Sequence, residues 1–299
     1  MVRRVLFVCF VGMLASVATA GDLDPPAGPI TPTDRERIHG PSATVPVTID
    51  ESGSYVLTGN LTGVAGEHGI VIAADGVTLD LNGFVLRGVT DSLAAIATDG
   101  ARSAVTVTNG TIEGWGGDGI SLRDADGVRI SEVTAHNNGA SGIAAGDGAM
   151  IERCTAYDNL DGMEISSGVV RDCIARGNTE GGVLAVTEST VLSCHATGNG
   201  ANGIEAQSRS VLRENHTSSN GQSGVTVTGS FNTVLDNTSS MDGIGVRATS
   251  DSNSIFRNTV NFAFVDSYDI SDSNTLGPII DTSGGTIVSS AQPFANIAN

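Results

Sequence analysis

The chain has 299 residues, and its 33 acidic residues outnumber the 15 basic ones, which gives a formal net charge of −18 at pH 7. Every basic residue is an arginine, because the sequence contains no lysine. A field of this sign repels nucleic acid and anionic lipid, so neither is an expected partner.

The first residues have the three parts of a secretory signal. Two arginines come first, residues 5–17 are apolar, and the small residues 18–20 follow. This order predicts a signal peptide over residues 1–20 and export to the medium, the cell surface or the periplasm. A membrane anchor is the alternative, but spanning a bilayer takes about 20 apolar residues. No later stretch predicts membrane insertion.

Short strands separated by turns follow a polar leader. Residues 21–44 are rich in proline and polar side chains, which predicts an extended segment outside the core. The next runs alternate apolar and polar residues between glycine-containing turns, which is typical of strands. The first of these strand regions are residues 52–61, 69–72, 77–83 and 105–112.

A short phrase of glycine and an apolar residue then recurs at intervals of 19 to 23 residues. Its glycines are Gly119, Gly142, Gly162, Gly182, Gly203, Gly224 and Gly243. A period near 20 that is built of strands predicts a solenoid, whose units must stack to bury apolar surface. We expect an all-β parallel solenoid of roughly ten coils over residues 45–280. The tail, residues 281–299, leaves the repeat and is expected to cap the open end.

Aligned coils show which positions face inward. Small or apolar residues recur in three columns, which predicts that these columns are buried, while the charged columns between them face solvent. Cys154, Cys173 and Cys194 share one inner column, which indicates a buried stack rather than a zinc site with closely spaced ligands. Asparagines continue this column and form a second one, which predicts side-chain ladders along the axis. The two sets are Asn215, Asn237 and Asn258, and Asn138, Asn159, Asn178, Asn199 and Asn220, the latter followed by Asp242.

Two carboxylates stand in the outward column of the strand after the glycine phrase. Glu164 and Glu205 are two coils apart, so about 9.6 Å at the spacing of parallel strands. This is the far limit of the separation in inverting glycosidases, about 6.5–9.5 Å. The alternative is a pair of solvated glutamates on a tolerant surface. Arg123 and Arg247, in the next outward column, are expected at the ends of the stack, away from these carboxylates.

Further charged pairs are expected to be structural. Glu152 and Arg171 share an outward column, and Arg153 neighbours Asp172, so the spacing predicts two ion pairs between coils. A lyase base would be the functional alternative for either arginine.

Two histidines and the single tryptophan have open alternatives. His195 and His216 share an outward column about 5 Å apart, where they could bind a metal ion or be a chance pair. Trp115 lies in a loop and could stack on a sugar ring or cover the edge of the solenoid.

The chain resembles secreted bacterial right-handed parallel β-helix repeat proteins of the pectin-lyase-like superfamily. The resemblance rests on the Gly-Ile-x-Leu strand, the Ile-x-x-Asn corner, residues 77–84, and the Gly-Trp-Gly-Gly-Asp-Gly phrase at 114–119. It covers roughly residues 45–280. It implies a group rich in polysaccharide lyases, hydrolases and epimerases, whose catalytic groups lie on the outer face of the sheet containing the glycine phrase.

Two functional hypotheses follow from the residues and the resemblance. In the first, an exported protein binds, and in a catalytic form cleaves, an extracellular polysaccharide as a lyase or glycoside hydrolase. Glu164 and Glu205 would be acid and base, while Asp161, Asn202, Gln207 and Trp115 would contact the sugar. Calcium is the cofactor that a uronate substrate would need beside so acidic a chain, and no other metal site is predicted. In the second hypothesis, the protein is a non-catalytic structural or adhesive component of the cell surface or matrix.

Overall fold

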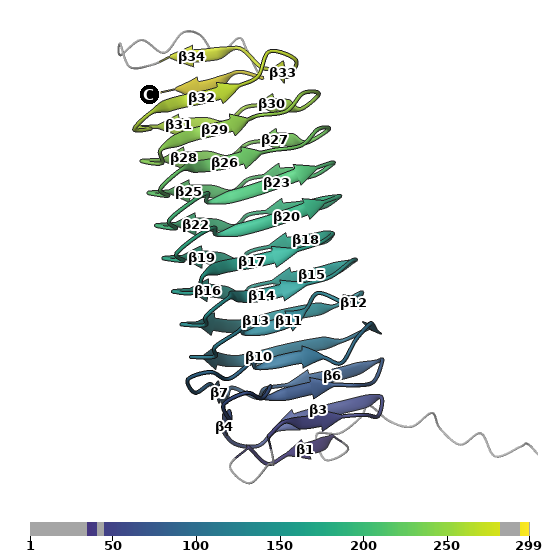
Figure 1. The fold of residues 1–299 in the computed structure, drawn as a ribbon. Helices are drawn as coiled ribbons and strands as arrows, with labels where there is room; N and C mark the ends of the chain where they lie inside the picture. The colour runs from purple at the N-terminus through teal and green to yellow at the C-terminus, as the bar shows by residue number, and fades with distance from the viewer. Residues whose placement is uncertain (1–34, 41–44, 282–293, 299) are drawn as a thin grey trace, which may run out of the picture. The chain divides into compact units, whose positions relative to one another are not determined.

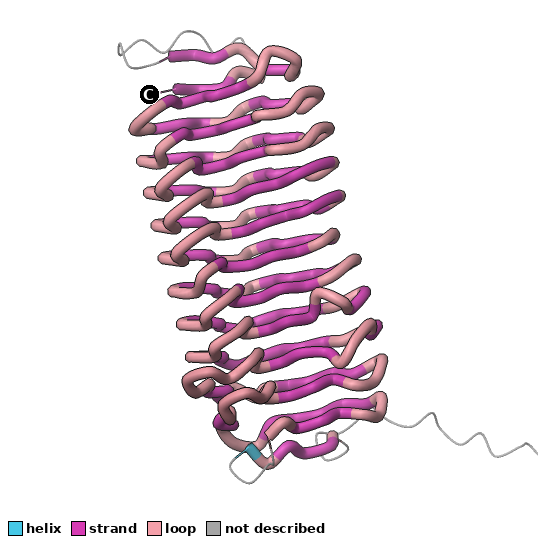
Figure 2. The backbone as a smooth tube through the Cα atoms, viewed as in Figure 1, coloured by secondary structure: helices cyan, strands magenta, loops and turns pink. Residues whose placement is uncertain are grey.

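The chain winds into stacked coils of parallel strands (Figure 1). The structure is a computed structural model that describes residues 35–40, 45–281 and 294–298. One sheet has eleven strands, one from each turn, so the solenoid has about eleven turns, close to the ten expected. The described residues contain no α-helix, and the short helical segment in Figure 2 is a 3₁₀ turn at Gly40. The all-β solenoid predicted from the repeat is therefore confirmed.

Each complete coil contributes strands to three series. The first series is the eleven-stranded sheet, which contains β2 (Val47–Ile49), β5 (Ile70–Ile72), β8 (Ile96–Thr98), β11 (Ile120–Leu122), β14 (Ser141–Ala145), β17 (Asp161–Ile165), β20 (Val183–Thr187), β23 (Ile204–Ser208), β26 (Ser223–Val227), β29 (Ile244–Ala248) and β32 (Asp266–Ile270). All neighbours in this sheet pair in parallel, for example Met163 with Val183 and Val183 with Ile204. This sheet carries the strands that follow the glycine phrase.

The other two series belong to one 22-stranded sheet, because the long strands β10 (Thr106–Glu113) and β13 (Arg129–His136) run through both. The second series also contains β1 (Glu36–Ile38), β3 (Gly53–Leu57), β6 (Val77–Asp80), β15 (Ala149–Glu152), β18 (Gly168–Arg171), β21 (Ser189–Leu192), β24 (Val211–Arg213), β27 (Thr233–Leu235), β30 (Ser254–Phe256) and β33 (Thr275–Leu276). The third also contains β4 (Leu61–Thr62), β7 (Val85–Arg87), β16 (Thr155–Tyr157), β19 (Ile174–Arg176), β22 (His195–Thr197), β25 (His216–Ser218), β28 (Thr238–Ser240), β31 (Thr259–Asn261), β34 (Ile279–Asp281) and β35 (Asn296–Ala298). A small sheet joins β9 (Arg102–Ser103) to β12 (Ala125–Asp126).

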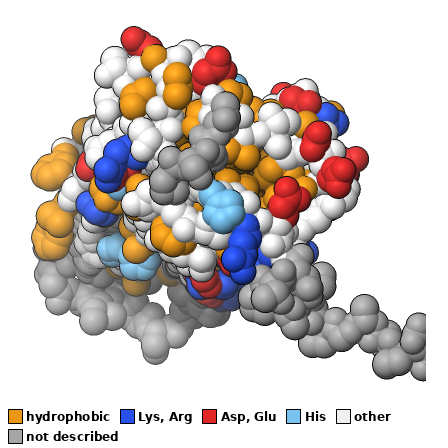
Figure 3. All heavy atoms as spheres, turned by 90° about the horizontal axis from the view of Figure 1, so that it is seen from below, with side chains coloured by type: hydrophobic (Ala, Val, Ile, Leu, Met, Phe, Trp, Pro, Cys, Tyr) orange, Lys and Arg blue, Asp and Glu red, His pale blue; other side chains and the backbone are white. Residues whose placement is uncertain are grey.

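The solenoid extends beyond the limits expected for it. Strand β1 lies in the segment predicted as a leader, yet it pairs with β3 and so adds a rung before residue 45. Strand β35 lies in the predicted cap, yet it pairs with β31 and β34 as another rung. The signal peptide (1–20), the leader up to residue 34 and tail residues 282–293 lie outside the described residues. Figure 3 views the protein from the end that carries β1 and shows hydrophobic side chains between charged ones.

The interior holds the three columns that the alignment placed there. Ile151, Val170 and Val191 are each fully buried, and so are the alanines two residues after the cysteines. Cys154, Cys173 and Cys194 are buried and carry free thiols, as predicted for a stack. Hydrogen bonding with Cys173 and burial raise the pKa of Cys154 and of Cys194 well above its ordinary value.

Side-chain amides form continuous ladders at the corners between strand series. In the main ladder the Oδ1 atom of each asparagine after Asn138 accepts hydrogen bonds from the backbone N–H and the Nδ2 of the asparagine one coil earlier. Asn178 donates both to Asn199 at 3.1 and 2.9 Å, and Asn199 donates both to Asn220 at 3.0 and 2.9 Å. The full ladder is Asn138, Asn159, Asn178, Asn199, Asn220 and Asp242. The prediction of this ladder is confirmed.

Asp242 ends the main ladder as a fully buried carboxylate. Its Oδ1 accepts from the N–H and Nδ2 of Asn220, both at 2.8 Å. Its Oδ2 accepts from the hydroxyls of Thr217 and Ser239 at 2.9 and 2.6 Å. The four donors meet the requirement that a buried charge be hydrogen-bonded.

Two further ladders run along other corners. The first is the ladder predicted to continue the cysteine column. It begins where the N–H of Cys194 donates to Asn215, and it continues through Asn237 and Asn258 to Asn296 of β35. A third ladder was missed by the sequence analysis. It runs from Ser210 through Asn232, Asn253 and Asn274.

Replacing Asn199 by alanine is expected to destabilise the protein by about 3 kcal/mol. The substitution removes the acceptor of the Asn178 N–H and one of the two acceptors of its Nδ2, which keeps its bond to the carbonyl oxygen of Ala156, and each buried unsatisfied donor costs about 1–3 kcal/mol. Urea unfolding followed by circular dichroism measures the change. Gln222→Ala, which removes an exposed amide whose side chain has no hydrogen bond to another described residue, is the control. Equal stability of the two variants would contradict the importance of the ladder.

Candidate functional site

A groove lies on the outer surface of the eleven-stranded sheet, centred on the coil that contains β20. Its volume is about 160 Å³. We call it the Gly181 groove. Its walls include Asp161, Glu180, Gly181, Leu184, Asn202, Glu205 and Gln207. Four of the predicted site residues, Asp161, Asn202, Glu205 and Gln207, are thus brought together, whereas Glu164 and Trp115 are not among the lining residues.

Gly181 creates the hollow. Asp161 lies in the coil before Gly181 and Asn202 in the coil after it, as the hydrogen bonds between these coils show. The N–H of Gly181 donates to Oδ1 of Asp161 at 2.9 Å. A Cβ atom placed on Gly181 would lie 3.4 Å from that Oδ1 and 3.8 Å from the carbonyl oxygen of Asn202, which are ordinary contacts. The missing side chain therefore leaves open space between two polar residues.

Hydrogen bonds fix the polar wall of the groove. Nδ2 of Asn202 donates to Oε2 of Glu205 at 2.8 Å. Oδ1 of Asn202 accepts from the N–H of Ser223 at 3.2 Å and from the hydroxyl of Thr226 at 3.3 Å. The amide of Asn202 is thereby held in one orientation, and it positions the carboxylate of Glu205. Glu180 is exposed, and its carboxylate has no hydrogen-bond or ion-pair partner among the described residues.

Glu164 is held outside the groove by an arginine. Nη2 of Arg123 donates to Oε2 of Glu164 at 2.8 Å, and Nη1 of the same arginine pairs with Asp118. Burial by itself lowers the pKa of Arg123, but hydrogen bonds to Asp118 and Glu164 outweigh it and raise that pKa. The expectation that Arg123 lies away from the carboxylates is wrong, because the long side chain crosses Ala144 to reach the second coil beyond its own.

Glu164 and Glu205 are two coils apart, as predicted, with Leu184 at the same position between them. Their carboxylates are engaged by different partners, Glu164 by Arg123 from an earlier coil and Glu205 by Asn202 within its own. This geometry does not bring the two into one site. Their role as acid and base stays a prediction.

Trp115 is part of the interior. Its side chain is 1 % exposed, and its Nε1 donates to the carbonyl oxygen of Leu86 at 3.1 Å. The ring packs over Gly63 and Gly69, where an added Cβ would approach it to 2.7 and 2.6 Å. Stacking of Trp115 on a sugar ring is therefore excluded, because no face of the ring is open to solvent. In the sequence, the glycines at 63 and 69 were the feature that could have predicted a buried position for Trp115.

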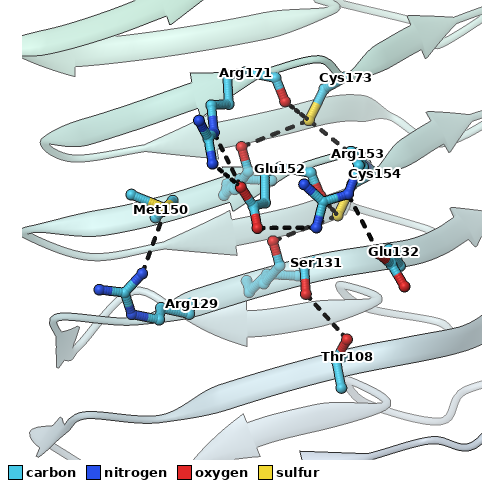
Figure 4. Close-up of polar contacts among 12 residues, drawn as sticks. Thr108, Arg129, Ser131, Glu132, Met150, Glu152, Arg153, Cys154, Arg171 and Cys173 are labelled. Atoms are coloured by element: carbon cyan, nitrogen blue, oxygen red, sulfur yellow. Dashed lines mark hydrogen bonds and ion pairs between the residues drawn. The ribbon is translucent and has the colours of Figure 1, made fainter.

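The charged residues of the second series form a structural network (Figure 4). Glu152 accepts from Nε of Arg171 at 3.0 Å, which confirms the predicted pair. Arg153 binds Glu152 at 3.1 Å and Glu132 at 3.3 Å instead of Asp172, so that prediction is wrong. The hydrogen bonds from Arg171 are the main reason why the pKa of Glu152 is lowered.

The two histidines lie side by side, as predicted. His195 pairs in register with His216, and their ring centroids are 5.6 Å apart at an interplanar angle of 47°. Within the described parts of the chain, no group of three or more His, Cys, Asp or Glu side chains is placed to hold a metal ion.

Another ring stack on the third series was missed by the sequence analysis. His136 stacks on Tyr157 with centroids 4.6 Å apart, and the guanidinium of Arg176 lies 4.1 Å from the centre of the Tyr157 ring. These residues follow one another in register in successive coils. Their shared outward column in the aligned coils could have predicted this stack.

Comparison with known proteins supports the architecture. The family model "Right handed beta helix region" matches residues 68–215. The chain is a right-handed parallel β-helix. The A-module of mannuronan C-5 epimerase AlgE6 from Azotobacter vinelandii is similar in structure, with a TM-score of 0.62 and 16% identity over 87% of this chain and 86% of the module. Pectate lyase Pel9A has a TM-score of 0.58 and 13% identity over 86% of this chain and 82% of its own.

A third similar structure is an alginate lyase from Paenibacillus, with a TM-score of 0.50 and 16% identity over 74% of this chain and 92% of the lyase. At these identities the likeness shows the fold. No curated protein matches the chain. In the described residues, no helix has the length and apolar character needed to span a bilayer.

The fluorescence of Trp115 is expected to report a buried ring. Because Trp115 is the only tryptophan, all tryptophan emission comes from it. Because its ring is buried, this emission should be blue-shifted, resist quenching by acrylamide, and stay unchanged when oligosaccharides are added. Trp115→Phe, which removes the hydrogen bond to Leu86, should cost about 1 kcal/mol of stability in addition to any packing loss. Red-shifted, readily quenched emission from the native protein would contradict this placement.

The pair of Glu152 and Arg171 is expected to lose its contribution to stability in acid. A carboxyl whose pKa is lowered by folding stabilises the native state above its unfolded pKa, and this contribution disappears as pH falls through its folded pKa. Arg171→Gln should therefore raise the titration midpoint of Glu152, measured by NMR of the side-chain carboxyl carbon. Arg209→Gln, which breaks a separate exposed pair with Glu188, should leave that midpoint unchanged.

Proposed function

We propose that this β-helix is an exported protein that binds an extracellular polysaccharide in the Gly181 groove. The observation that carries the proposal is the groove itself, which joins carboxylates, amides and the apolar side chain of Leu184 on the outer surface of the stacked strands. Sugar rings present hydroxyl groups at their edges and C–H groups on their faces. The polar walls suit the hydroxyl groups, and Leu184 suits a ring face, in keeping with the few placed polar groups of ligand sites.

The similar structures support a carbohydrate ligand. Their names describe enzymes that act on mannuronan, pectate and alginate, all of which are polysaccharides. They share the fold with this chain, and a shared fold is an analogy for function rather than a demonstration of it. Export rests on the signal peptide predicted over residues 1–20, which would direct the mature protein out of the cytoplasm, where such polymers occur.

Binding accounts for the groove without requiring cleavage. Glu164 is occupied by Arg123, so the predicted acid–base pair with Glu205 lacks one free member. This ion pair favours the binding form of the first hypothesis over the cleaving form. A cleaving form of the protein would have to use the carboxylates that line the groove, Asp161, Glu180 and Glu205.

Filling the groove should abolish binding. Gly181→Leu places a side chain in the open space, and the ordinary contacts of the new Cβ allow the coil to keep its structure. We expect at least a tenfold loss of affinity, about 1.4 kcal/mol, for any polysaccharide that the wild type binds in a panel tested by isothermal titration calorimetry. Gly181→Ala should bind more nearly as the wild type does, because a methyl group fills little of the groove.

Thr190→Leu, which introduces the same leucine side chain on the second series, is the control and should bind normally. Unchanged binding by Gly181→Leu, or no binding across the panel by wild type, would refute the proposal. The same incubations report cleavage through new reducing ends or unsaturated products, with and without calcium. If cleavage occurs, Glu205→Gln tests whether the groove is responsible.

A further inference from the structure

The Gly181 groove carries negative charge that the protein does not neutralise. Several carboxylates of the outer surface are paired with arginine, as in Glu152 with Arg171 and Asp236 with Arg257. In the groove, Asp161 accepts from the N–H of Gly181 and Glu205 accepts from the amide of Asn202, and both donors are neutral. Glu180 has no side-chain partner among the described residues. Three carboxylates therefore face one small space without a cation.

No described residue that lines the groove supplies a cation. Arg123, which reaches toward this surface from an earlier coil, is held by Asp118 and Glu164. The residues that line the groove include no arginine or histidine, and the sequence has no lysine. The net charge of −18 adds a field of the same sign. A concave site with charges of one sign concentrates counter-ions and excludes co-ions.

From this charge distribution we infer that the groove selects a glycan that bears protonated amines, such as a polymer of 2-amino sugars, and rejects polyuronates. The inference rests on the proposed function and deepens it. An ammonium group is a donor for charge-assisted hydrogen bonds, which are stronger and shorter than neutral ones. The free carboxylate of Glu180 is an acceptor for it, and the Oδ2 of Asp161 is another. A uronate carboxylate in the same place would meet like charge.

This selection differs from that suggested by the structural neighbours. The polymers in their names, mannuronan, pectate and alginate, are polyuronates. The fold is shared, but the side chains on the outer strands decide which glycan fits. The hollow at Gly181 and the uncompensated carboxylates around it are features of this chain.

Three oligosaccharides of equal length test the inference by calorimetry on the full chain, at a pH where the sugar amine is protonated. They are oligomers of glucosamine, of N-acetylglucosamine, and of galacturonic acid. We expect the glucosamine oligomer to bind at least tenfold more tightly than its N-acetylated counterpart, and the galacturonic acid oligomer not to bind. Added salt should weaken the glucosamine interaction, because exposed charges are screened within about 10 Å at 0.1 M.

Variants separate the groove from the general acidity of the chain. Glu180→Gln removes one groove charge and should weaken glucosamine binding about tenfold, with a smaller dependence on salt. Glu67→Gln removes an equal charge from an exposed loop before β5 and should change nothing. Gly181→Leu leaves the charge intact and should abolish binding.

The outcomes distinguish this inference from the function on which it rests. If the N-acetylated or uronate oligomer binds as well as the amine and Gly181→Leu still abolishes binding, the groove is a glycan site but its charge selection is refuted. Equal effects of Glu67→Gln and Glu180→Gln would also overturn the selection, because the attraction would belong to the whole chain. Failure of all three oligomers to bind in the wild type, together with no binding across the wider panel, would refute both.

Discussion

The side-chain amide ladders are the constraint on which the rest of the structure depends. In the main ladder each asparagine after Asn138 lies at the same corner, with its Oδ1 placed to accept two hydrogen bonds from the previous coil. A slip of one residue would leave these buried donors unpaired and would also exchange the inner and outer faces of every strand. The ladders therefore fix the register, and the register places every inward column on its neighbours and every outward column in line.

Because the register is fixed, a residue that differs from its column neighbours changes the shape of the surface at that point. Because Asp161 and Asn202 occupy the coils on either side of Gly181, the loss of one side chain leaves a hollow with polar walls. The glycines of the repeated phrase have no such freedom. At Gly182, for example, an added Cβ would lie 2.4 Å from the carbonyl oxygen of Gly203, so this glycine serves packing. The two adjacent glycines look alike in the sequence but have different roles.

The inward half of the structure could be predicted from the sequence, because small and apolar residues repeat there with little variation. The cysteine stack and two amide ladders followed directly from aligned columns. The outward half could not, since a long side chain contacts residues that its column does not identify. Arg123 reaches across a coil to Glu164, and Arg153 prefers Glu132 to Asp172. Trp115 was misplaced because its space comes from glycines in an earlier coil.

The buried carboxylate of Asp242 gives the main ladder a direction. Amide-to-amide hydrogen bonds run from donor to acceptor toward higher residue numbers, and neighbouring amides polarise one another, so an anion is a favourable terminus for the row. Ala263, which follows at the next corner, has no group to extend the row. A duplicated coil could thus be spliced in before Asp242 with its hydrogen bonds preserved, whereas a coil added after it would need a separate row. The solenoid can therefore be lengthened by whole coils before Asp242 but not directly after it.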